Sequence, residues 1–169
     1  MKLQTVDIQT LTPEIFSVFG QRNALLTAGA EGKVNPMTIG WCQLGRLWGL
    51  DTCTVYVRPE RYTYQFMEER DYFTVSVLPQ SHRQTMQICG TQSGRDIDKV
   101  KACGLTLRYG AGDAPFFDEA EWVLVCKKLY IQDMKPECVK DERIFQSYTP
   151  AKGGWHRLYV GEVLEAYQR

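Results

Sequence analysis

Hydrophobic and polar residues alternate over several short stretches of the chain, a two-residue period that is typical of β-strands with one buried face. The clearest stretch is residues 72–78, in which aromatic and aliphatic residues alternate with Thr74 and Ser76 before Pro79 ends the pattern. Glu31-Gly32-Lys33 separates two apolar runs and predicts a hairpin turn. Strands or extended segments are predicted at residues 3–8, 24–27, 37–41, 52–57, 72–78, 105–109, 121–131 and 157–166.

Helical spacing of apolar residues is limited to short segments between these strands. The best defined is residues 64–70, where Phe66 and Met67 are expected to face inward. Near the start of the chain, Thr12 is placed to cap a short helix with Pro13 in its first turn. Its apolar residues are expected to be core contacts: Ile15, Phe16, Val18 and Phe19. Further helices are predicted at residues 83–89, at 96–103 before Gly104, and on the surface at 136–145.

The remaining glycine-rich segments indicate connections between elements. They are read as a connector at residues 45–49, a polar turn at 90–94 and a loop at 111–114. Short strands dominate, and the helices between them are too few for one helix per strand, which favours an antiparallel barrel over a parallel α/β sheet. We therefore predict a mostly β fold, a closed barrel with helical decoration, formed by residues 1–169 as a single domain.

Composition narrows the possible partners. Lys plus Arg and Asp plus Glu both count 20, so net charge does not favour nucleic acid or an anionic membrane as a partner. No apolar run reaches the length of a membrane span or a signal peptide, so a cytoplasmic location is expected. The cysteines are read as reduced thiols, and without Cys-x-x-Cys pairs no metal site is expected; they stand at positions 42, 53, 89, 103, 126 and 138.

The chain has no nucleophile elbow, P-loop, dinucleotide-binding glycine fingerprint or HExxH pair. A chain without such a constellation often uses a cofactor for its chemistry. Residues 55–63 are a candidate binding segment for a phosphorylated cofactor. A strand ends at Pro59 and a helix begins within four residues, and a helix N-terminus binds phosphate well. Two arginines and two hydroxyls gather at this helix start: Arg58, Arg61, Tyr62 and Thr63. A second candidate is residues 89–99, in which glycines free the backbone and Thr91, Ser93, Arg95 and Lys99 supply donors.

An ordered set of motifs covers most of the chain. It comprises Asn35-x-Met-Thr-Ile-x-Trp41, Val57-Arg-Pro-x-Arg-Tyr-Thr63, Tyr72-Phe-Thr-Val-Ser76, Cys89-Gly-Thr-x-Ser-Gly-Arg-Asp-x-Asp-Lys99 and Leu158-Tyr-Val-Gly-Glu-Val163. This set resembles the flavin reductase-like, flavoredoxin-type FMN-binding family. The resemblance implies a split β-barrel, a Greek-key-like antiparallel barrel with short helices, that forms a homodimer and binds FMN near the subunit interface.

The resemblance also implies a role for each matching segment. Residues 58 and 61–63 would hold the FMN phosphate, and residues 37–39 and 41 would lie along the ring or ribityl chain. The pocket would be completed by backbone and side-chain donors of Ser76, Cys89, Gly90, Ser93 and Lys99. A cation such as Lys99 near the flavin N1 would favour the reduced, anionic ring. The implied cofactor-binding residues are Met37, Thr38, Ile39, Trp41, Val57, Arg58, Arg61, Tyr62, Thr63, Ser76, Cys89, Gly90, Ser93, Lys99 and Trp155.

Several of these residues have a structural alternative. Surface arginines near a helix start are common, and the tryptophans are by default core or interface residues, with a stacking role considered only for Trp41 and Trp155. Cys89 could be redox-active, although a buried inert thiol is the simpler reading. His156 is a candidate proton donor to reduced flavin, and a structural hydrogen bond is the alternative that the sequence favours.

The expected function is electron transfer through FMN, with NAD(P)H as hydride donor in a flavin reductase or a redox protein as partner in a flavoredoxin. Two other classes stay open at this stage. One is a flavin- or heme-binding module without enzymatic activity, and the other is an FMN-dependent oxidase of the pyridoxamine-phosphate type.

Overall fold

The computed structural model describes residues 2–10 and 14–169, so the capping position predicted for Thr12 and Pro13 lies outside the described residues. The strands are β1 (Gln4–Val6), β2 (Ala24–Ala30), β3 (Lys33–Ile39), β4 (Cys42–Leu47), β5 (Leu50–Val57), β6 (Tyr72–Val77), β7 (Leu107–Tyr109), β8 (Pro115–Phe117), β9 (Trp122–Asp133) and β10 (Arg157–Gln168). The helices are α1 (Ile15–Ser17), α2 (Tyr62–Glu69), α3 (Arg83–Thr91) and α4 (Lys99–Ala102), with a π-helix at Val18–Arg22. Short 3-10 turns occupy Ile8–Thr10, Gln80–His82, Ala111–Asp113, Pro136–Cys138 and Glu142–Ser147.

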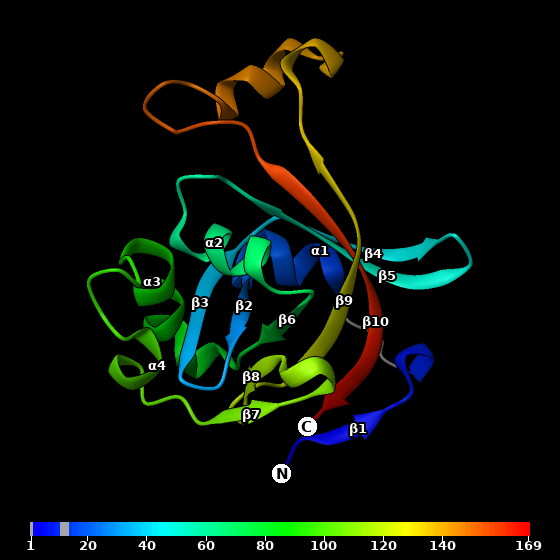
Figure 1. Ribbon diagram of the computed structural model, residues 1–169, viewed down its shortest axis with the longest axis vertical. Helices are drawn as coiled ribbons and strands as arrows, with labels where there is room; N and C mark the ends of the chain where they lie inside the picture. Colours follow the sequence, from blue (N-terminus) through cyan, green and yellow to red (C-terminus); the bar gives the residue numbers. More distant parts are fainter. Residues whose placement is uncertain (1, 11–13) are drawn as a thin grey trace.

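The main sheet is antiparallel and curls into a barrel. Its strands follow the order β3-β2-β6-β9-β10-β5-β4, with β1 added beside β10. The ladder begins at β3 and ends at β4, and these two strands follow each other in the chain through Gly40 and Trp41. Helix α2 packs against β2 and β3 and is drawn in front of them in Figure 1. The mostly β split barrel predicted from the sequence is confirmed.

Strand alternation gives the barrel its core. Inward-facing residues of every long strand pack together, and α2 adds Phe66 and Met67 as predicted. In β6, for example, Phe73, Val75 and Val77 belong to this core. A second apolar layer lies on the outer face of β2 and β9, under α3 and the β7–β8 hairpin. The barrel wall is therefore covered on this side and carries helices that approach β3.

The structure corrects several local predictions. Phe16 is 96% exposed and is not a core contact, whereas Val18 and Phe19 are buried. The segment 45–49, predicted as a connector, belongs mostly to β4 and to its tight turn into β5, where Trp48 and Gly49 both have positive φ. Prediction failed there because polar and glycine residues occupy an edge strand with little buried surface.

The helix predicted at residues 83–89 extends through Gly90 to Thr91, whereas the two helices predicted after it are shorter than expected. Residues 96–103 contain only α4, which begins after Asp98 caps it by accepting from the Lys101 N–H. The surface helix predicted at residues 136–145 is two 3-10 turns, and residues 111–114 lead into β8, a strand that the sequence pattern did not reveal. In the described part of the chain, no helix is long and apolar enough to cross a membrane.

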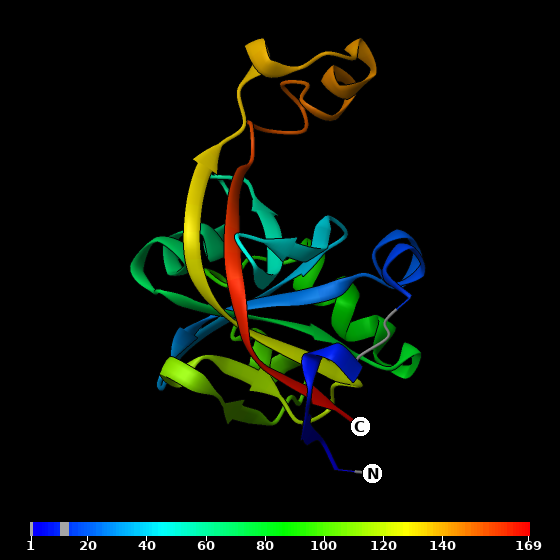
Figure 2. The same cartoon turned by 90° about the vertical axis from the view of Figure 1, so that its right-hand side faces the viewer.

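A long excursion separates β9 from β10. We call residues 134–156 the arm, because both views show it standing beyond the barrel at the end of these two strands (Figures 1 and 2). The strands that carry it pair over most of their length, with register shifts at Val160/Gly161 and Val163/Glu165. The arm is tied back to the barrel by hydrogen bonds from the turn that precedes α2.

Candidate functional site

Polar side chains converge where the start of α2 meets the middle of β3. Asn35 shares the inward face of β3 with core residues and reaches α2, where its Nδ2 donates to Thr63 Oγ1 at 2.7 Å. Both side chains are buried, at 2% and 1% exposure. This hydrogen bond fixes the first turn of α2 against the strand. We use the term cationic seat for this region, formed by Asn35, Arg61, Tyr62, Thr63, Gly90, Gly94 and Lys99.

Two basic side chains of the cationic seat join β3 and α3. Lys99 is 5% exposed, and its Nζ donates to the carbonyl oxygens of Pro36 at 3.1 Å and Cys89 at 3.0 Å. Burial lowers the pKa of Lys99 from its ordinary value. Arg61 Nη2 donates to the carbonyl oxygen of Gly90 at 2.9 Å. Each cation has further N–H donors, so the seat has donor capacity for an anion.

The loop after α3 completes the seat by packing tightly on β3. A Cβ at Gly94 would stand 1.9 Å from Asn35 Oδ1, so only glycine fits here. The next residue places its guanidinium over an aromatic ring, with Arg95 Cζ 4.8 Å from the centroid of Tyr62. Ser93 Oγ accepts from the Arg95 N–H at 3.1 Å and holds the turn.

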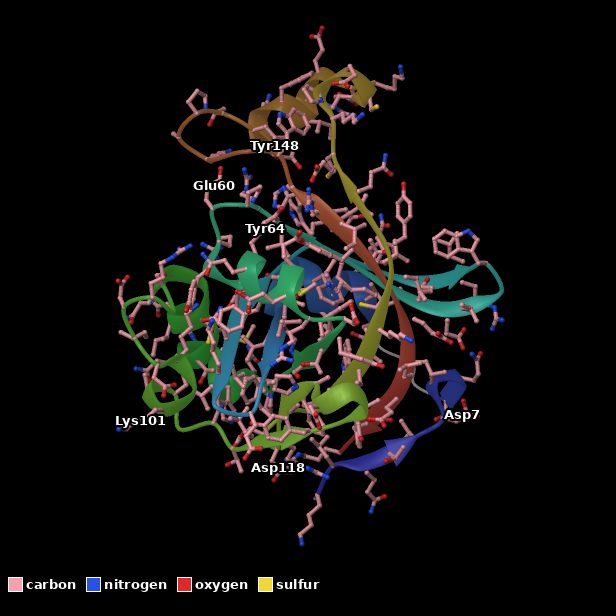
Figure 3. All side chains as sticks on the ribbon, viewed as in Figure 1. Asp7, Glu60, Tyr64, Lys101, Asp118 and Tyr148 are labelled. Atoms are coloured by element: carbon pink, nitrogen blue, oxygen red, sulfur yellow. The ribbon has the colours of Figure 1, made fainter. Side chains whose placement is uncertain are left out.

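Arg58 belongs to a different group of contacts. Its guanidinium donates to the carbonyl oxygens of Gly154 at 2.7 Å and Ser147 at 2.8 Å, both in the arm. Glu60 accepts from the Gly154 N–H at 2.7 Å, and its pKa is lowered by this hydrogen bond. Figure 3 shows Glu60 below and to the left of Tyr148, near the base of the arm. The sequence predicted that both arginines contact one phosphate. In the structure Arg61 lies in the seat, whereas Arg58 is hydrogen-bonded to the arm.

Aromatic side chains pack where the arm meets the barrel. Tyr148 and Trp155 stack with ring centroids 3.9 Å apart, and Trp41 lies 4.6 Å from the ring of His156. Tyr148 Oη and His156 Nδ1 are 3.0 Å apart and share a hydrogen bond. Trp41 is 44% exposed and keeps one open side. Trp41 and Trp155 are thus joined to the base of the arm rather than to the seat.

His156 is uncharged at neutral pH. Burial is the main cause that lowers its pKa to about 4, and the nearby positive charge of Arg58 acts in the same direction. A neutral imidazole is too weak an acid to act as a proton donor near pH 7. The hydrogen bond to Tyr148 agrees with the structural role that the sequence favoured.

Other predicted residues are oriented toward the protein interior. The side chains of Met37, Ile39 and Val57 belong to the barrel core, so a ligand beside them would meet their backbone. Ser76 is fully buried in β6, and within the described residues its Oγ has no hydrogen-bond partner. Thr38 lies on the outer face of β3, where its Oγ1 donates to the carbonyl oxygen of Met86 at 2.6 Å. Gly90 packs on Thr38, which brings α3 close to the strand.

The cysteines are free thiols, as predicted. Cys89 is fully buried, and burial followed by the effect of Cys103 raises its pKa to about 12, which fits the inert reading. Cys42 and Cys53 bring their Sγ atoms to 3.5 Å, a pair that their positions in the sequence did not suggest. Among the described residues, no group of three His, Cys, Asp or Glu side chains is arranged to hold a metal ion.

Sequence reasoning missed several residues that organise these contacts. Asn35 stood in a quoted motif without an assigned role. In the second candidate segment, Gly94 was expected to free the backbone and Arg95 to supply a donor, but their partners were not predicted. Their contacts with β3 and Tyr62 depend on the fold and have no local signal. The same is true of Glu60 and Tyr148, which hold the arm through contacts that span more than eighty residues of sequence.

The pKa of His156 predicts how stability changes with pH. Because the folded-state pKa lies below its ordinary value of 6.5, the unfolded chain binds the proton first as pH falls. The stability due to neutral His156 is complete above pH 6.5 and is lost as pH falls toward 4. We expect this loss to be on the order of 2 kcal/mol and to be absent from His156→Gln.

Urea unfolding at several pH values between 7 and about 4.5 measures this difference through the slope of stability against pH. His82→Gln is the matched control and is expected to keep the slope of the unmodified protein. Equal slopes for the unmodified protein and His156→Gln would contradict the prediction.

Comparison with known proteins places this geometry in a family. Residues 16–169 match the family model described as flavin reductase like domain. No curated protein matches the chain. The flavoredoxin of Methanosarcina acetivorans is 23% identical with a TM-score of 0.68, and the alignment covers 88% of this chain and 68% of that one.

Two further solved structures have the same fold. An FMN-binding domain of a flavin reductases-like enzyme from Shewanella baltica is 22% identical with a TM-score of 0.67, covering 98% of this chain and 76% of that one. The NADH:FAD oxidoreductase SgcE6 of Streptomyces globisporus is 17% identical with a TM-score of 0.64, covering 86% and 73%. At these identities the structures show the fold, and the family match supports a flavin-binding redox function. The chain belongs to the flavin reductase like domain family.

Proposed function

We propose that the protein binds FMN noncovalently and acts as an oxidoreductase that passes electrons through it. The cationic seat is the observation that carries this proposal. It gathers Arg61, Lys99 and the Thr63 hydroxyl around the middle of β3, a donor set suited to a phosphate dianion. A phosphate there would also favour the charged form of Lys99, whose pKa burial lowers.

The rest of the cofactor would extend along β3 from residue 35 toward residue 41. Thr38 and the partly open Trp41 would flank it, with the backbone of the buried Met37 and Ile39 between them. The backbone of α3 at Gly90 would form the facing wall, because this helix end packs on Thr38. FMN, when bound, supplies a ring that accepts two electrons as a hydride. The protein would contribute orientation and positive charge rather than a reacting side chain.

NAD(P)H is the proposed electron donor. Its nicotinamide would need access to the flavin ring near Trp41, where the chain keeps an exposed aromatic side. One structural neighbour is named an NADH:FAD oxidoreductase, and another is named a flavoredoxin, for which a redox protein would be the partner instead.

Stopped-flow mixing of the FMN-loaded protein with NADH and with NADPH tests the donor. We expect loss of the flavin absorbance within seconds with at least one nucleotide, since hydride transfer between stacked rings needs no further group from the protein. Free FMN at the same concentration is the control. Unchanged absorbance with both nucleotides would contradict a reductase and favour a protein electron donor.

The phosphate contact predicts which arginine discriminates FMN from riboflavin. Arg61→Ala removes a charge from the seat, so we expect it to weaken FMN about tenfold or more and riboflavin little, because riboflavin lacks the phosphate. Arg58→Ala is the matched variant and is expected to affect the two ligands alike, since its guanidinium is bonded to the arm. Titration followed by flavin fluorescence measures both affinities. If Arg61→Ala weakens both ligands equally, this arginine does not contact the phosphate.

We also propose a homodimer, as the family resemblance implies. Large apolar side chains are exposed together on the β4–β5 hairpin and β9: Trp48 is 60% and Tyr130 43% exposed, with ring centroids 6.1 Å apart. Such a patch is typical of an interaction surface. Sedimentation velocity is expected to give the dimer mass for the unmodified chain and a shift toward monomer for Trp48→Glu. A monomer at micromolar concentration would contradict the proposal.

A further inference from the structure

Four aromatic side chains connect the arm to the short link between β3 and β4. Tyr148 and Trp155 stack in the arm, with ring centroids 3.9 Å apart and an angle of 11° between the ring planes. Tyr148 Oη shares a hydrogen bond with His156 Nδ1, and the imidazole lies 4.6 Å from the Trp41 ring. We call these four side chains the aromatic row. It begins in the arm and ends at Trp41, which flanks the proposed position of the flavin ring.

Arg58 holds the aromatic row at the two residues that precede its stacked rings. Its Nη2 donates to the carbonyl oxygen of Ser147 at 2.8 Å, and its Nη1 donates to that of Gly154 at 2.7 Å. Ser147 comes directly before Tyr148, and Gly154 comes directly before Trp155. The planar guanidinium therefore sets the spacing of the two backbone segments that carry the stack. The Arg58 Cζ also lies 5.2 Å from the Tyr148 ring centroid, so the charge contacts the row itself.

Glu60 adds a second contact from the same turn. Its carboxylate accepts from the Gly154 N–H at 2.7 Å. A Cβ at Gly154 would stand 2.9 Å from Glu60 Oε1, and Gly153 has a φ of +93°, so two glycines allow the arm to pass this close to the carboxylate. Both backbone polar groups of Gly154 are therefore bonded to the turn before α2, the N–H to Glu60 and the carbonyl oxygen to Arg58.

Trp41 depends on the arm for its orientation. It lies in the link between β3 and β4, outside the strand ladder, and its side chain is 44% exposed. In the described part of the chain its neighbouring rings are His156 and Tyr148, and both belong to the arm. If the arm moved away, the indole would be free to adopt other rotamers.

We propose that Arg58 is a positioning residue that fixes the Trp41 indole beside the flavin ring by way of the arm; this rests on the proposed flavin function. The guanidinium acts through the aromatic row rather than by touching the cofactor. The alternative is a purely structural role, in which Arg58 holds the arm without any effect on Trp41.

Fluorine NMR of the flavin-free protein, labelled with 5-fluorotryptophan, tests the contact between arm and indole. Replacing each of the four tryptophans by phenylalanine assigns the signals. In Arg58→Ala we expect the signals of Trp41 and Trp155 to shift or broaden. The signals of Trp48, in the β4–β5 hairpin, and of Trp122, in the barrel core, are expected to stay. A response of Trp155 without one of Trp41, or of neither, would overturn the inference.

Glu60 and a second arginine of the arm supply matched variants for the same spectra. Glu60→Gln keeps an oxygen that can accept from the Gly154 N–H, so all signals are expected to stay, whereas Glu60→Ala is expected to move those of Trp41 and Trp155. Arg143→Ala removes an exposed guanidinium that pairs with a neighbouring carboxylate in the arm and should leave both signals in place.

A double-mutant cycle tests whether Arg58 acts on the flavin through Trp41. Riboflavin is the ligand, because it lacks the phosphate and so removes the seat from the comparison. Arg58→Ala is expected to weaken riboflavin about fivefold, but less than twofold in a Trp41→Ala background, since a residue that acts through Trp41 has no effect once the indole is gone. Titration by flavin fluorescence measures the four affinities. Equal losses in the two backgrounds would show that Arg58 acts independently of Trp41 and would overturn the inference.

Failure of the inference is distinguishable from failure of the proposed function. Flavin binding combined with additive losses, or with a Trp41 signal that ignores Arg58→Ala, overturns the positioning role and leaves the flavin function standing. If neither FMN nor riboflavin binds, the proposed function fails. The fluorine spectra of the flavin-free protein still decide in that case whether Arg58 fixes Trp41.

Discussion

The position of β3 at the end of the ladder is the constraint on which the site depends. An end strand has one neighbour in the sheet, here β2, and the backbone groups of its other edge need partners from elsewhere. Pro36 lies in this strand, where a residue without an N–H is tolerated. Its carbonyl oxygen accepts from the buried ammonium of Lys99, and α3 packs along the same strand through Thr38. The hydrogen bond from Lys99 to the edge of β3 therefore also places a positive charge beside the proposed cofactor.

The turn between β5 and α2 directs Arg58 and Arg61 to different parts of the structure. Val57 faces the barrel core, so the alternation of the strand directs Arg58 outward, where the arm supplies carbonyl oxygens as acceptors. Three residues later Arg61 stands immediately before α2, and its guanidinium donates to the end of α3 instead. The result is one cation that stabilises the arm and another that remains with the seat. Two charged side chains that are close in sequence therefore need not contact the same ligand group.

The same turn joins the seat to the base of the arm. Within it the Arg61 N–H donates to the Arg58 carbonyl oxygen at 3.0 Å. Arg58 reaches the arm and Arg61 reaches α3 from the two ends of this short segment. The seat and the arm are therefore attached to one turn of the chain.

The sequence by itself determined the elements with strong local patterns and the family. Strict alternation located β6, the glycine turn located the β2–β3 hairpin, and apolar spacing located α2 with Phe66 and Met67 inward, because burial on one face leaves a period that can be read directly. Weakly buried segments carry no such period. For this reason β4 looked like a connector, and the segment 96–103 looked more helical than it is.

The contacts that build the site were decided by the tertiary structure alone. Asn35 and Thr63 are 28 residues apart, Lys99 and Pro36 are 63 apart, and Arg58 and Gly154 are 96 apart. No local preference encodes such pairs, since each forms only when the barrel brings its two elements together. Sequence named Arg58, Arg61 and Lys99 as candidates from their chemistry. Which of them lie at one place was settled by the edge of β3, the alternation of β5 and the packing of α3.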